Sequence, residues 1–483
     1  MAQGGSSGSC GLTDLPLELL SIILENSGWK DILRVRQTCK YLAEASRLFA
    51  VWKHQHKGLS MTIPRLLEAP TDYYKSQELE DLFLRWKRSQ IGWRTIDGFY
   101  GHRRNIVNDD AMEVHLVKGG RWLLTVQQTG CTMYYDLDAE TVAGRLLIPD
   151  QLEDHPLFRK YRFSSVGVCV DIDETSPILQ FNLAFTIARP SDDLSPSSDY
   201  LTQIWSVSIV FDDSRRVSGL SANLLASFPR HSAVRFLYSM SLLGRYVAFT
   251  ARDDGLGLYS LIIEWEKAGR NPSNYPCRAF YSHESRDVRL LPNNRALDIG
   301  ENMLRLYDYL SVKETTTTEP LNMDTSTTKY LLWEVMIPRL FGRPMSGPFL
   351  VRGTTRFVLL ADQVIYGLII DDAVNTFSPP QLMKLLDSPD RFALEGLPIL
   401  GYYHGLATVR GFGIVLLHYS FPDECEAQLE MQGFTGGLNY FSVLEGQTGQ
   451  AGQPVMDEGS GRVVLDNPPE IDHRVVHDFS RCI

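Results

Sequence analysis

Adjacent aspartates are the residues of this sequence whose type and spacing come nearest to chemistry. They occur as five pairs: Asp109 and Asp110, Asp192 and Asp193, Asp212 and Asp213, Asp253 and Asp254, and Asp371 and Asp372. Carboxylates hydrolyse glycosidic bonds when they reach one substrate from separate strands, which neighbours in the chain do not demonstrate. Aspartate also stabilises turns and discourages pairing at sheet edges. We therefore expect turn residues here, with a glycosidase-like enzyme as the alternative.

No other signature of catalysis or metal binding stands out. His54 and His56 lie two residues apart at the end of a predicted helix, where they do not share a face, so chelation is not expected. The sequence contains no Gly-x-x-x-x-Gly-Lys phosphate loop, and Gly255 and Gly257 fit a hairpin turn. We predict no catalytic residue, no cofactor and no metal site in this chain.

The N-terminal stretch from residue 12 to residue 52 has the periodicity of three short helices. Thr13 and Asp14 offer capping oxygens, and Pro16 fits the first turn of the first helix. Each helix has an apolar side, made of Leu15, Leu19, Ile22 and Ile23 in the first, of Ile32, Val35 and Cys39 in the second, and of Leu42 and Ala43 in the third, which leads to Trp52.

This unit is too small to cover all its apolar side chains. Domains of about 40 residues usually need a metal, disulfides or a partner, and the stretch has neither a ligand cluster nor a cysteine pair. The first helix is apolar nearly all round, with Leu15, Leu17, Leu19, Leu20, Ile22, Ile23 and Leu24. Such a helix is covered on more than one side. We expect one side to face the bundle and the other to face a second surface, in this chain or in another protein.

The order of these residues resembles the F-box. The resemblance covers residues 12–55 and rests on Leu15-Pro16-Leu17-Glu18-Leu19-Leu20, Ile23-Leu24, Asp31-Ile32-Leu33, Val35, Arg36, Cys39, Leu48 and Trp52. Residues 25–29 depart from the Leu-Asp-Pro-like step of many members. The helices of that family bind the Skp adaptor of cullin–RING ubiquitin ligases. The resemblance implies this adaptor-binding set: Leu15, Pro16, Leu19, Leu20, Ile23, Leu24, Ile32, Leu33, Val35, Cys39 and Trp52. A plain three-helix bundle is the alternative.

Residues 58–95 also have helical periodicity and predict a connector. Ser76 can cap a helix whose first turn is acidic and whose end is basic, an order that complements the helix dipole. Its apolar stripe consists of Leu79, Leu82, Phe83 and Trp86. This helix would set the angle between the N-terminal helices and the rest of the chain.

From about residue 105 the helical periodicity gives way to paired β-rich runs. Each pair has a Gly/Arg turn, an apolar strand, a polar turn and an aromatic-rich strand that often ends in Asp. The pairs are 119–126 with 130–136, 181–187 with 200–211, 244–250 with 257–265, 295–299 with 303–309, and 356–360 with 363–370, and a sixth begins at 411–417. Their anchors, Trp122, Phe185, Val247, Leu297, Val358 and Ile414, are 50 to 63 residues apart. Antiparallel repeats of this length predict propeller blades.

The predicted fold class is therefore mainly β. We expect a disordered tail (1–11), a three-helix F-box domain (12–57), a helical connector (58–100) and a β-propeller of six or seven irregular blades (101–483). This pattern of paired strands and turns resembles the divergent propellers that follow the F-box in many fungal proteins. A pair of β-sandwich domains is the alternative.

Several local expectations accompany the propeller. Residues 457–464 and 474–479 resemble the closing segment of those chains, with residues 106–117 as the mate of the terminal strand. Residues 379–386 are expected to form a short helix between blades. The tryptophans Trp122, Trp205, Trp265 and Trp333 are expected to pack between blades rather than to form a ligand cage.

Charge is unevenly distributed along the chain, whose formal net charge is −11. Residues 1–100 carry 13 Lys and Arg against 11 Asp and Glu, whereas the remainder carries 34 against 47. An acidic large domain argues against broad affinity for nucleic acid, which needs clustered Lys and Arg. The acidity would steer a basic segment of a protein partner, or it serves only solubility.

Cysteine usage predicts an intracellular protein of the cytoplasm or nucleus. The seven cysteines, at positions 10, 39, 131, 169, 277, 425 and 482, are far apart and form no Cys-x-x-Cys pair, which fits a reducing compartment. The N-terminal residues do not resemble a signal peptide, and no run of 18 apolar residues predicts a membrane span.

Together these features predict the substrate-receptor subunit of a Skp–cullin–F-box ubiquitin ligase. The N-terminal helices would bind the adaptor, and through it a cullin, while the propeller would bind a protein substrate, so the chemistry would occur on other subunits. One alternative is a scaffold that binds the adaptor without ubiquitin transfer. Another is a propeller enzyme such as a glycosidase, which needs a polar cluster with perturbed pKa values at the propeller centre.

Overall fold

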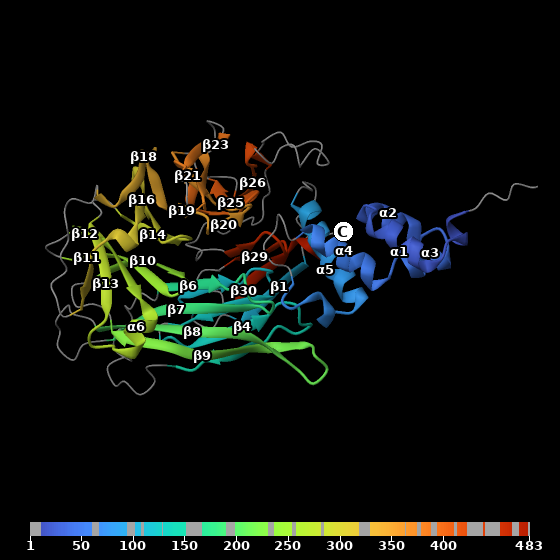
Figure 1. Ribbon diagram of the computed structural model, residues 1–483, viewed down its shortest axis with the longest axis horizontal. Helices are drawn as coiled ribbons and strands as arrows, with labels where there is room; N and C mark the ends of the chain where they lie inside the picture. The colour runs from blue at the N-terminus through green and yellow to red at the C-terminus, as the bar shows by residue number, and fades with distance from the viewer. Residues whose placement is uncertain are drawn as a thin grey trace, which may run out of the picture.

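The computed structural model describes residues 11–59, 67–93, 102–107, 111–127, 129–150, 167–189, 199–229, 236–253, 257–281, 285–317, 329–362, 364–373, 378–387, 394–409, 413–422, 438–439, 455–465 and 473–481. These residues form a group of helices and a ring of sheets, and the helices project from one side of the ring (Figure 1). The predicted tail lies outside the described residues except for Gly11.

The N-terminal helices follow the predicted order with shifted bounds. They are η1 (Leu12–Asp14), α1 (Leu17–Glu25), α2 (Trp29–Arg36), α3 (Lys40–Ala45) and α4 (Phe49–Leu59). Pro16 precedes α1 at its N-cap, where no side chain caps the helix. The predicted third helix is two helices, because the chain turns after Ala45 with the N–H groups of Arg47 and Leu48 bonded to Glu44 and Ala45. Cys39 ends up at the N-cap of α3, outside α2.

The connector contains η2 (Thr71–Tyr73) and α5 (Ser76–Gly92), which confirms the predicted helix. The prediction that Ser76 caps it is wrong. Lys75 is the N-cap residue, and its N–H donates to Glu78 Oε2 at 2.6 Å. The Ser76 hydroxyl instead donates to the Arg47 carbonyl at 2.5 Å, which ties the start of α5 to the turn between α3 and α4.

Strands of the described residues form seven antiparallel sheets. The first three contain β2 (Glu113–Leu116), β3 (Trp122–Val126), β4 (Thr132–Asp136) and β5 (Gly144–Ile148); β6 (Gly167–Ile172), β7 (Gln180–Arg189), β8 (Asp199–Phe211) and β9 (Val217–Pro229); and β10 (Phe236–Leu243), β11 (Tyr246–Asp253), β12 (Gly257–Glu264) and β13 (Pro276–Tyr281), to which β17 (Glu314–Thr316) adds. A short helix, α6 (Trp265–Arg270), follows β12.

The other four sheets continue the same meander. They contain β14 (Asp287–Leu291), β15 (Arg295–Ile299), β16 (Met303–Asp308) and β18 (Leu331–Met336), with η4 (Tyr309–Ser311) after β16; β19 (Leu340–Met345), β20 (Phe349–Val351), β21 (Thr354–Ala361), β22 (Val364–Asp371) and β23 (Gln381–Asp387); β24 (Leu394–Leu400), β25 (His404–Val409), β26 (Gly413–His418) and β27 (Leu438–Asn439); and β28 (Val455–Asp457), β29 (Arg462–Leu465), β30 (His473–Asp478) and β1 (His102–Val107). A last turn, η7 (Phe479–Arg481), follows β30.

These sheets are the blades of a seven-bladed β-propeller. First strands of neighbouring sheets contact one another, as β6 does with β10 and β10 with β14, which places them around the centre of the ring. The last sheet closes the ring, since β1 pairs with β30 from His102 opposite Asp478 to Val107 opposite His473. Predicted closure by the C-terminal strand is thus confirmed. Its mate is β1 alone, because β2 begins the first blade.

The five predicted hairpins are present as β3–β4, β7–β8, β11–β12, β15–β16 and β21–β22. Two expectations are wrong. The run at 411–417 was expected to start a sixth hairpin, but β26 is the second strand of the β25–β26 hairpin and the third strand of its blade. The run at 379–386 was expected to be helical, but β23 pairs with β22 there. Ladder hydrogen bonds and burial of Leu386 against the next blade outweigh the local helical spacing of its leucines.

The apolar core lies between blades rather than at the centre of the ring. Each neighbouring pair of blades shares a cluster of buried side chains, as Trp122 and Phe185 do between the first and second blades. Trp205 belongs to the same cluster, Trp265 packs between the second and third blades, and Trp333 packs between the fourth and fifth. The prediction that these tryptophans serve packing is confirmed.

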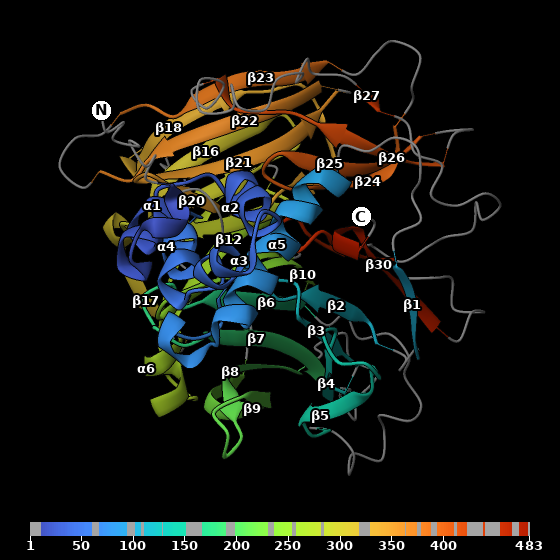
Figure 2. The same cartoon turned by 90° about the vertical axis from the view of Figure 1, so that its right-hand side faces the viewer.

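The helices cover one face of the propeller. Because neighbouring strands are antiparallel, turns alternate between two faces. We call the face made by the first-to-second and third-to-fourth strand turns the connector face, and the other the open face. The hydrogen bonds and ion pairs from the connector that are described below all reach turns of the connector face, at residues 120–121, 138, 179 and 458–461. Figure 2 shows the helices in front of the ring of sheets.

One half-buried carboxylate at a blade junction predicts a pH effect. Asp171 Oδ2, at the end of β6, accepts the Gly244 N–H of the third blade at 2.7 Å. Burial, which the Gly244 bond opposes, raises the pKa of Asp171 to about 6. A raised carboxyl pKa means that the folded chain prefers protonated Asp171. The contribution of Asp171 to the free energy of unfolding is therefore fully present below about pH 4 and is lost as the pH rises through 6. Asp171→Asn should therefore increase the free energy of unfolding by about 1–3 kcal/mol at pH 8.

The measurement is urea unfolding at pH 8 and at pH 4, where the gain from Asp171→Asn should disappear. Glu266→Gln, on the exposed part of α6, serves as the neutral control at both values and should stay within about 0.5 kcal/mol. A gain that is equal at both pH values would contradict the assignment to ionisation.

Candidate functional site

The helical bundle has a complete core of its own. Its buried side chains include Leu20 and Leu24 of α1, Ile32 of α2 and Trp52 of α4, and α5 contributes Leu79 and Phe83. The Trp52 indole donates to the Ser46 carbonyl at 3.0 Å. Because α5 belongs to this core, the predicted boundary between F-box helices and connector does not separate two packing units.

Apolar side chains also remain on the outside of α1. Leu19, Ile22 and Ile23 are 48%, 55% and 43% exposed. Their i, i+3, i+4 spacing puts them on one side of the helix, and Leu20 and Leu24 face the core from another. We call Leu19, Ile22 and Ile23 the α1 stripe. Leu12, in η1, and Leu17, at the start of α1, are exposed as well.

The structure separates the predicted adaptor-binding residues into three groups by exposure. Pro16, Leu19, Ile23 and Cys39 are exposed; Leu15, Leu33 and Val35 are half-buried against the bundle core; Leu20, Leu24, Ile32 and Trp52 are buried in it. Buried side chains hold the bundle together and do not reach a docking surface. The set also omitted Ile22, although its spacing from Leu19 was already visible in the sequence.

A buried ion pair joins the bundle to α5. The Arg36 guanidinium binds both Glu80 oxygens, at 2.5 and 2.9 Å, and its Nε donates to Ser46 Oγ at 2.9 Å. Glu80 is only 3% exposed. His56 lies on the same helix interface with its Nε2 2.8 Å from the Leu79 carbonyl, and burial lowers its pKa. Bidentate charged pairs have a defined geometry, so the angle between α2 and α5 is set.

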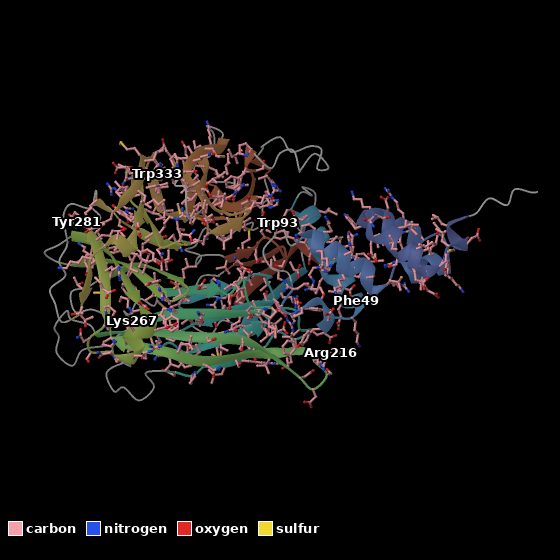
Figure 3. The ribbon with its side chains drawn as sticks, viewed as in Figure 1. Phe49, Trp93, Arg216, Lys267, Tyr281 and Trp333 are labelled. Atoms are coloured by element: carbon pink, nitrogen blue, oxygen red, sulfur yellow. The ribbon has the colours of Figure 1, made fainter. Side chains whose placement is uncertain are left out.

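The end of α5 is inserted between turns of the closing blade. Ser89 Oγ donates to the Gly459 carbonyl at 3.0 Å, and the Trp93 indole donates to the Glu458 carbonyl at 3.2 Å. The approach is close enough that a Cβ at Gly461, whose φ is +73°, would lie 2.6 Å from Ser89 Cβ. Trp93 is fully buried where the helices meet the sheets (Figure 3).

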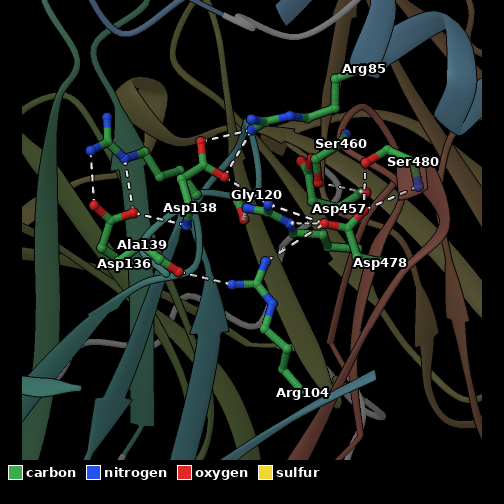
Figure 4. Close-up of polar contacts among 12 residues, drawn as sticks. Arg85, Arg104, Gly120, Asp136, Asp138, Ala139, Asp457, Ser460, Asp478 and Ser480 are labelled. Atoms are coloured by element: carbon green, nitrogen blue, oxygen red, sulfur yellow. Dashed lines mark hydrogen bonds and ion pairs between the residues drawn. The ribbon is translucent and has the colours of Figure 1, made fainter. Parts of the chain in front are cut away.

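A buried network of charges connects α5, the first blade and the closing blade (Figure 4). Arg462 of β29 is completely buried and donates to Asp478 Oδ2 at 3.2 Å, to Asp138 Oδ1 at 2.6 Å and to the Gly120 carbonyl at 2.8 Å. Arg85 of α5 binds both oxygens of Asp138, at 2.8 and 2.7 Å. Burial raises the pKa of Asp138, but the Arg462 and Arg85 guanidinium groups outweigh it and hold the pKa well below its usual range.

A second charged contact fixes the start of the connector. Arg121 binds both oxygens of Asp136, at 3.0 and 2.8 Å, and binds Glu68 Oε2 at 2.8 Å. The Leu179 N–H of the second blade donates to the Glu68 carbonyl at 2.6 Å. The Tyr74 hydroxyl accepts the N–H groups of Glu68 and Ala69 at 3.0 and 3.2 Å, and burial raises the pKa of Tyr74 to about 12. The connector therefore contacts the first, second and closing blades at once.

The recurring Arg and Asp of the sequence repeats make these contacts. Arg121 pairs with Asp136 within the first blade and Arg462 pairs with Asp478 within the closing blade, whereas Arg295 of the fourth blade reaches Asp372 of the fifth at 2.8 Å. The sequence showed the repeat but not its role, since partners on different blades are far apart along the chain.

The aspartates of these pairs that the structure describes lie in turns and at blade junctions. Asp212 binds the N–H groups of Ser214 and Arg216 in the β8–β9 turn, and Asp372 accepts from Arg295 and Thr355 after β22. The turn role of Asp212 agrees with the prediction, whereas the contact of Asp372 with another blade was not predicted. Asp109, Asp110, Asp192, Asp193 and Asp254 lie outside the described residues. Among the residues that are described, no group of three or more His, Cys, Asp and Glu is placed to hold a metal, and no helix is long and apolar enough to cross a bilayer.

The fold and site define a seven-bladed β-propeller protein with a rigidly attached N-terminal helical bundle. No family model and no curated protein matches the sequence. Solved structures that are similar include the β-propeller domain of Cps50 (Swd1) from Myceliophteria thermophila, with a TM-score of 0.42 and 11% identity over 78% of this chain and 99% of that one. The WD40 domain of SCAP from fission yeast has a TM-score of 0.40 and 7% identity over 77% of this chain and 85% of that one. Saccharomyces cerevisiae Sqt1 has a TM-score of 0.32 and 9% identity over 76% of this chain and 83% of that one. At these scores the likeness carries no argument, and the propeller assignment depends on the seven sheets.

Proposed function

We propose that this chain is an F-box-type substrate receptor, in which the α1 stripe binds a Skp-type adaptor and the propeller binds a protein substrate. The observation that carries the proposal is the α1 stripe itself, Leu19, Ile22 and Ile23, exposed on a bundle whose core is already complete. Exposed aliphatic side chains at helical spacing form a surface that a partner helix can cover.

The expected gain from covering the stripe is of the right size for a docking surface. Each of its three side chains is about half exposed, and complete burial of an exposed aliphatic side chain is worth about 1.5–3 kcal/mol. Covering the stripe would therefore contribute roughly 1 kcal/mol for each residue. Pro16 and Cys39 of the predicted set are also exposed, and Cys39 lies outside α1 at the N-cap of α3.

The open face of the propeller is the surface that we assign to the protein substrate. Ties from the connector occupy the connector face at the first, second and closing blades. The open face carries the links between blades, and surface loops on a rigid scaffold are where recognition residues collect. In this proposal the chain performs no covalent chemistry, and the cullin reaches it only through the adaptor.

The test is binding of purified Skp-type adaptor to the full chain. Leu19→Asp combined with Ile23→Asp should weaken binding by at least about 100-fold, because two charges would be buried at the interface without partners. The folded state should be kept, since both side chains are exposed. Titration calorimetry measures the affinity, and far-ultraviolet circular dichroism checks the fold.

Met336→Asp is the matched control, since Met336 is 75% exposed on β18 of the propeller. It should bind the adaptor like the parent chain. Wild-type affinity in the α1 variant would refute the proposed docking surface. An adaptor complex that recruits no cullin would assign the chain to scaffolds without ubiquitin transfer.

A further inference from the structure

The outer strand of the second blade is an unusually long sheet edge. β9 has 13 residues and pairs with β8 from Pro229 opposite Leu201 to Val217 opposite Phe211. It ends the strand order β6-β7-β8-β9, so no described strand pairs with its other side. Unpaired edges present backbone N–H and C=O groups to any extended chain that can reach them.

Five other described outer strands carry charged residues, whereas β9 carries none. Arg104 lies on β1, Arg145 on β5, Glu314 on β17, Glu334 on β18 and Lys384 on β23. β9 reads Val-Ser-Gly-Leu-Ser-Ala-Asn-Leu-Leu-Ala-Ser-Phe-Pro and contains no charged side chain. Charged side chains and short length are the usual devices that keep an edge from pairing, and β9 has neither.

The propeller itself provides an example of strand addition at an outer edge. β17 comes from the fourth blade and pairs antiparallel with β13 of the third, with Glu314 opposite Arg278 and Thr316 opposite Pro276. A segment of three residues is thus held on an outer strand, aided by the Arg278–Glu314 ion pair at 2.6 Å. The equivalent position on β9 has no occupant among the described strands.

Neighbouring elements limit what fits beside β9. Near one end Arg145 of β5 donates to the Ser218 carbonyl at 2.8 Å. Near the other, α6 lies so close that a Cβ at Gly269 would meet Ala226 Cβ at 2.7 Å. Between them the ladder has an irregularity, and Leu224 and Leu225 are 47% and 46% exposed. The open length between Leu220 and Leu225 is about 17 Å at strand spacing.

We propose that β9 binds a short extended segment of a partner protein, which adds as a fifth strand to the second blade. The segment is uncharged and has apolar side chains at alternate positions, which lie beside Leu224 and Leu225. A second copy of the chain does not fit as well, because α6 and β5 of both copies would have to pass each other at the same edge. This site is separate from the α1 stripe and does not depend on the proposed adaptor.

The probe is a fluorescent, end-capped peptide of alternating threonine and valine, compared with the same peptide carrying a central proline. Binding to the full chain is followed by fluorescence anisotropy, and hydrogen exchange locates the protected amides. The proline peptide should bind at least about tenfold more weakly, because proline lacks an N–H and cannot extend the ladder. Protection should appear on β9.

Leu224→Lys places a charge on the edge and should weaken peptide binding by at least about tenfold. Leu146→Lys is the matched control, since Leu146 is 59% exposed on β5, and it should bind like the parent. Equal binding by Leu224→Lys, protection on another strand, or no binding up to about 1 mM peptide would overturn the proposal. So would a dimer in sedimentation equilibrium that Leu224→Lys dissociates, because a second copy would then be the occupant.

Discussion

Arg462→Met is expected to destabilise the folded chain by about 3–5 kcal/mol. Arg462 is completely buried and binds Asp478, which is also buried, and Asp138. Methionine fills similar volume but leaves the buried Asp478 and the half-buried Asp138 without this partner. A buried charge without its partner is far costlier than a lost surface contact. Chemical denaturation of the full chain, followed by tryptophan fluorescence, measures the loss.

Lys118→Met is the control for Arg462→Met. The Lys118–Glu174 pair also joins two blades, at 3.1 Å, but its side chains are 37% and 40% exposed. Its loss should cost less than about 1 kcal/mol, because water solvates both charges. The difference between the two variants should shrink below about pH 4, where carboxylates become protonated and the stability from the depressed pKa of Asp138 is lost. Equal losses in the two variants at pH 7 would show that the network does not stabilise the ring.

Truncation after residue 454 is expected to abolish the folded monomer. The deleted segment contains β28, β29 and β30, which leaves β1 without its sheet. The connector would lose Gly459 and Glu458, which accept from Ser89 and Trp93, and the first blade would lose the Arg462 contact to Asp138. An open ring also exposes the apolar faces of the first and sixth blades and leaves β1 unpaired, which favours aggregation.

Size-exclusion chromatography and thermal unfolding of the truncated chain test the prediction. Co-expression of residues 455–483 as a separate polypeptide is the matched control, because it restores the strands without the covalent link. We expect the two pieces to copurify as a compact monomer. A truncated chain that stays monomeric with an unchanged melting temperature would contradict closure by the C-terminal strand.

Local patterns in the sequence determined the secondary structure of much of this chain. The α1 and α5 helices follow from apolar residues at helical spacing, and the β3–β4 and β11–β12 hairpins follow from apolar runs around short polar turns. These elements form wherever neighbours along the chain satisfy the backbone. The number and period of the hairpins then predicted a propeller, because repeated antiparallel units of this length are typical of propeller blades.

Only the tertiary structure decided which of these residues are available to a partner. Leu19 and Leu20 are both apolar neighbours on α1, yet one is exposed and the other is buried, because the bundle covers a single side of the helix. β23 was expected to be helical, and pairing with β22 made it a strand. The backbone hydrogen bonds between strands join residues that lie apart in the sequence, so the local spacing of apolar residues does not predict them.

The charges show the same division. Sequence alone established that Arg recurs at the start of a strand and Asp at the end of the next, but Arg462 meets Asp138 only because ring closure brings the last blade to the first. Contacts between residues more than 300 positions apart (324 for this pair) leave no local signature. The face that the connector covers, and the charge-free edge of β9 left without a strand, were therefore decided by packing between blades and not by any segment alone.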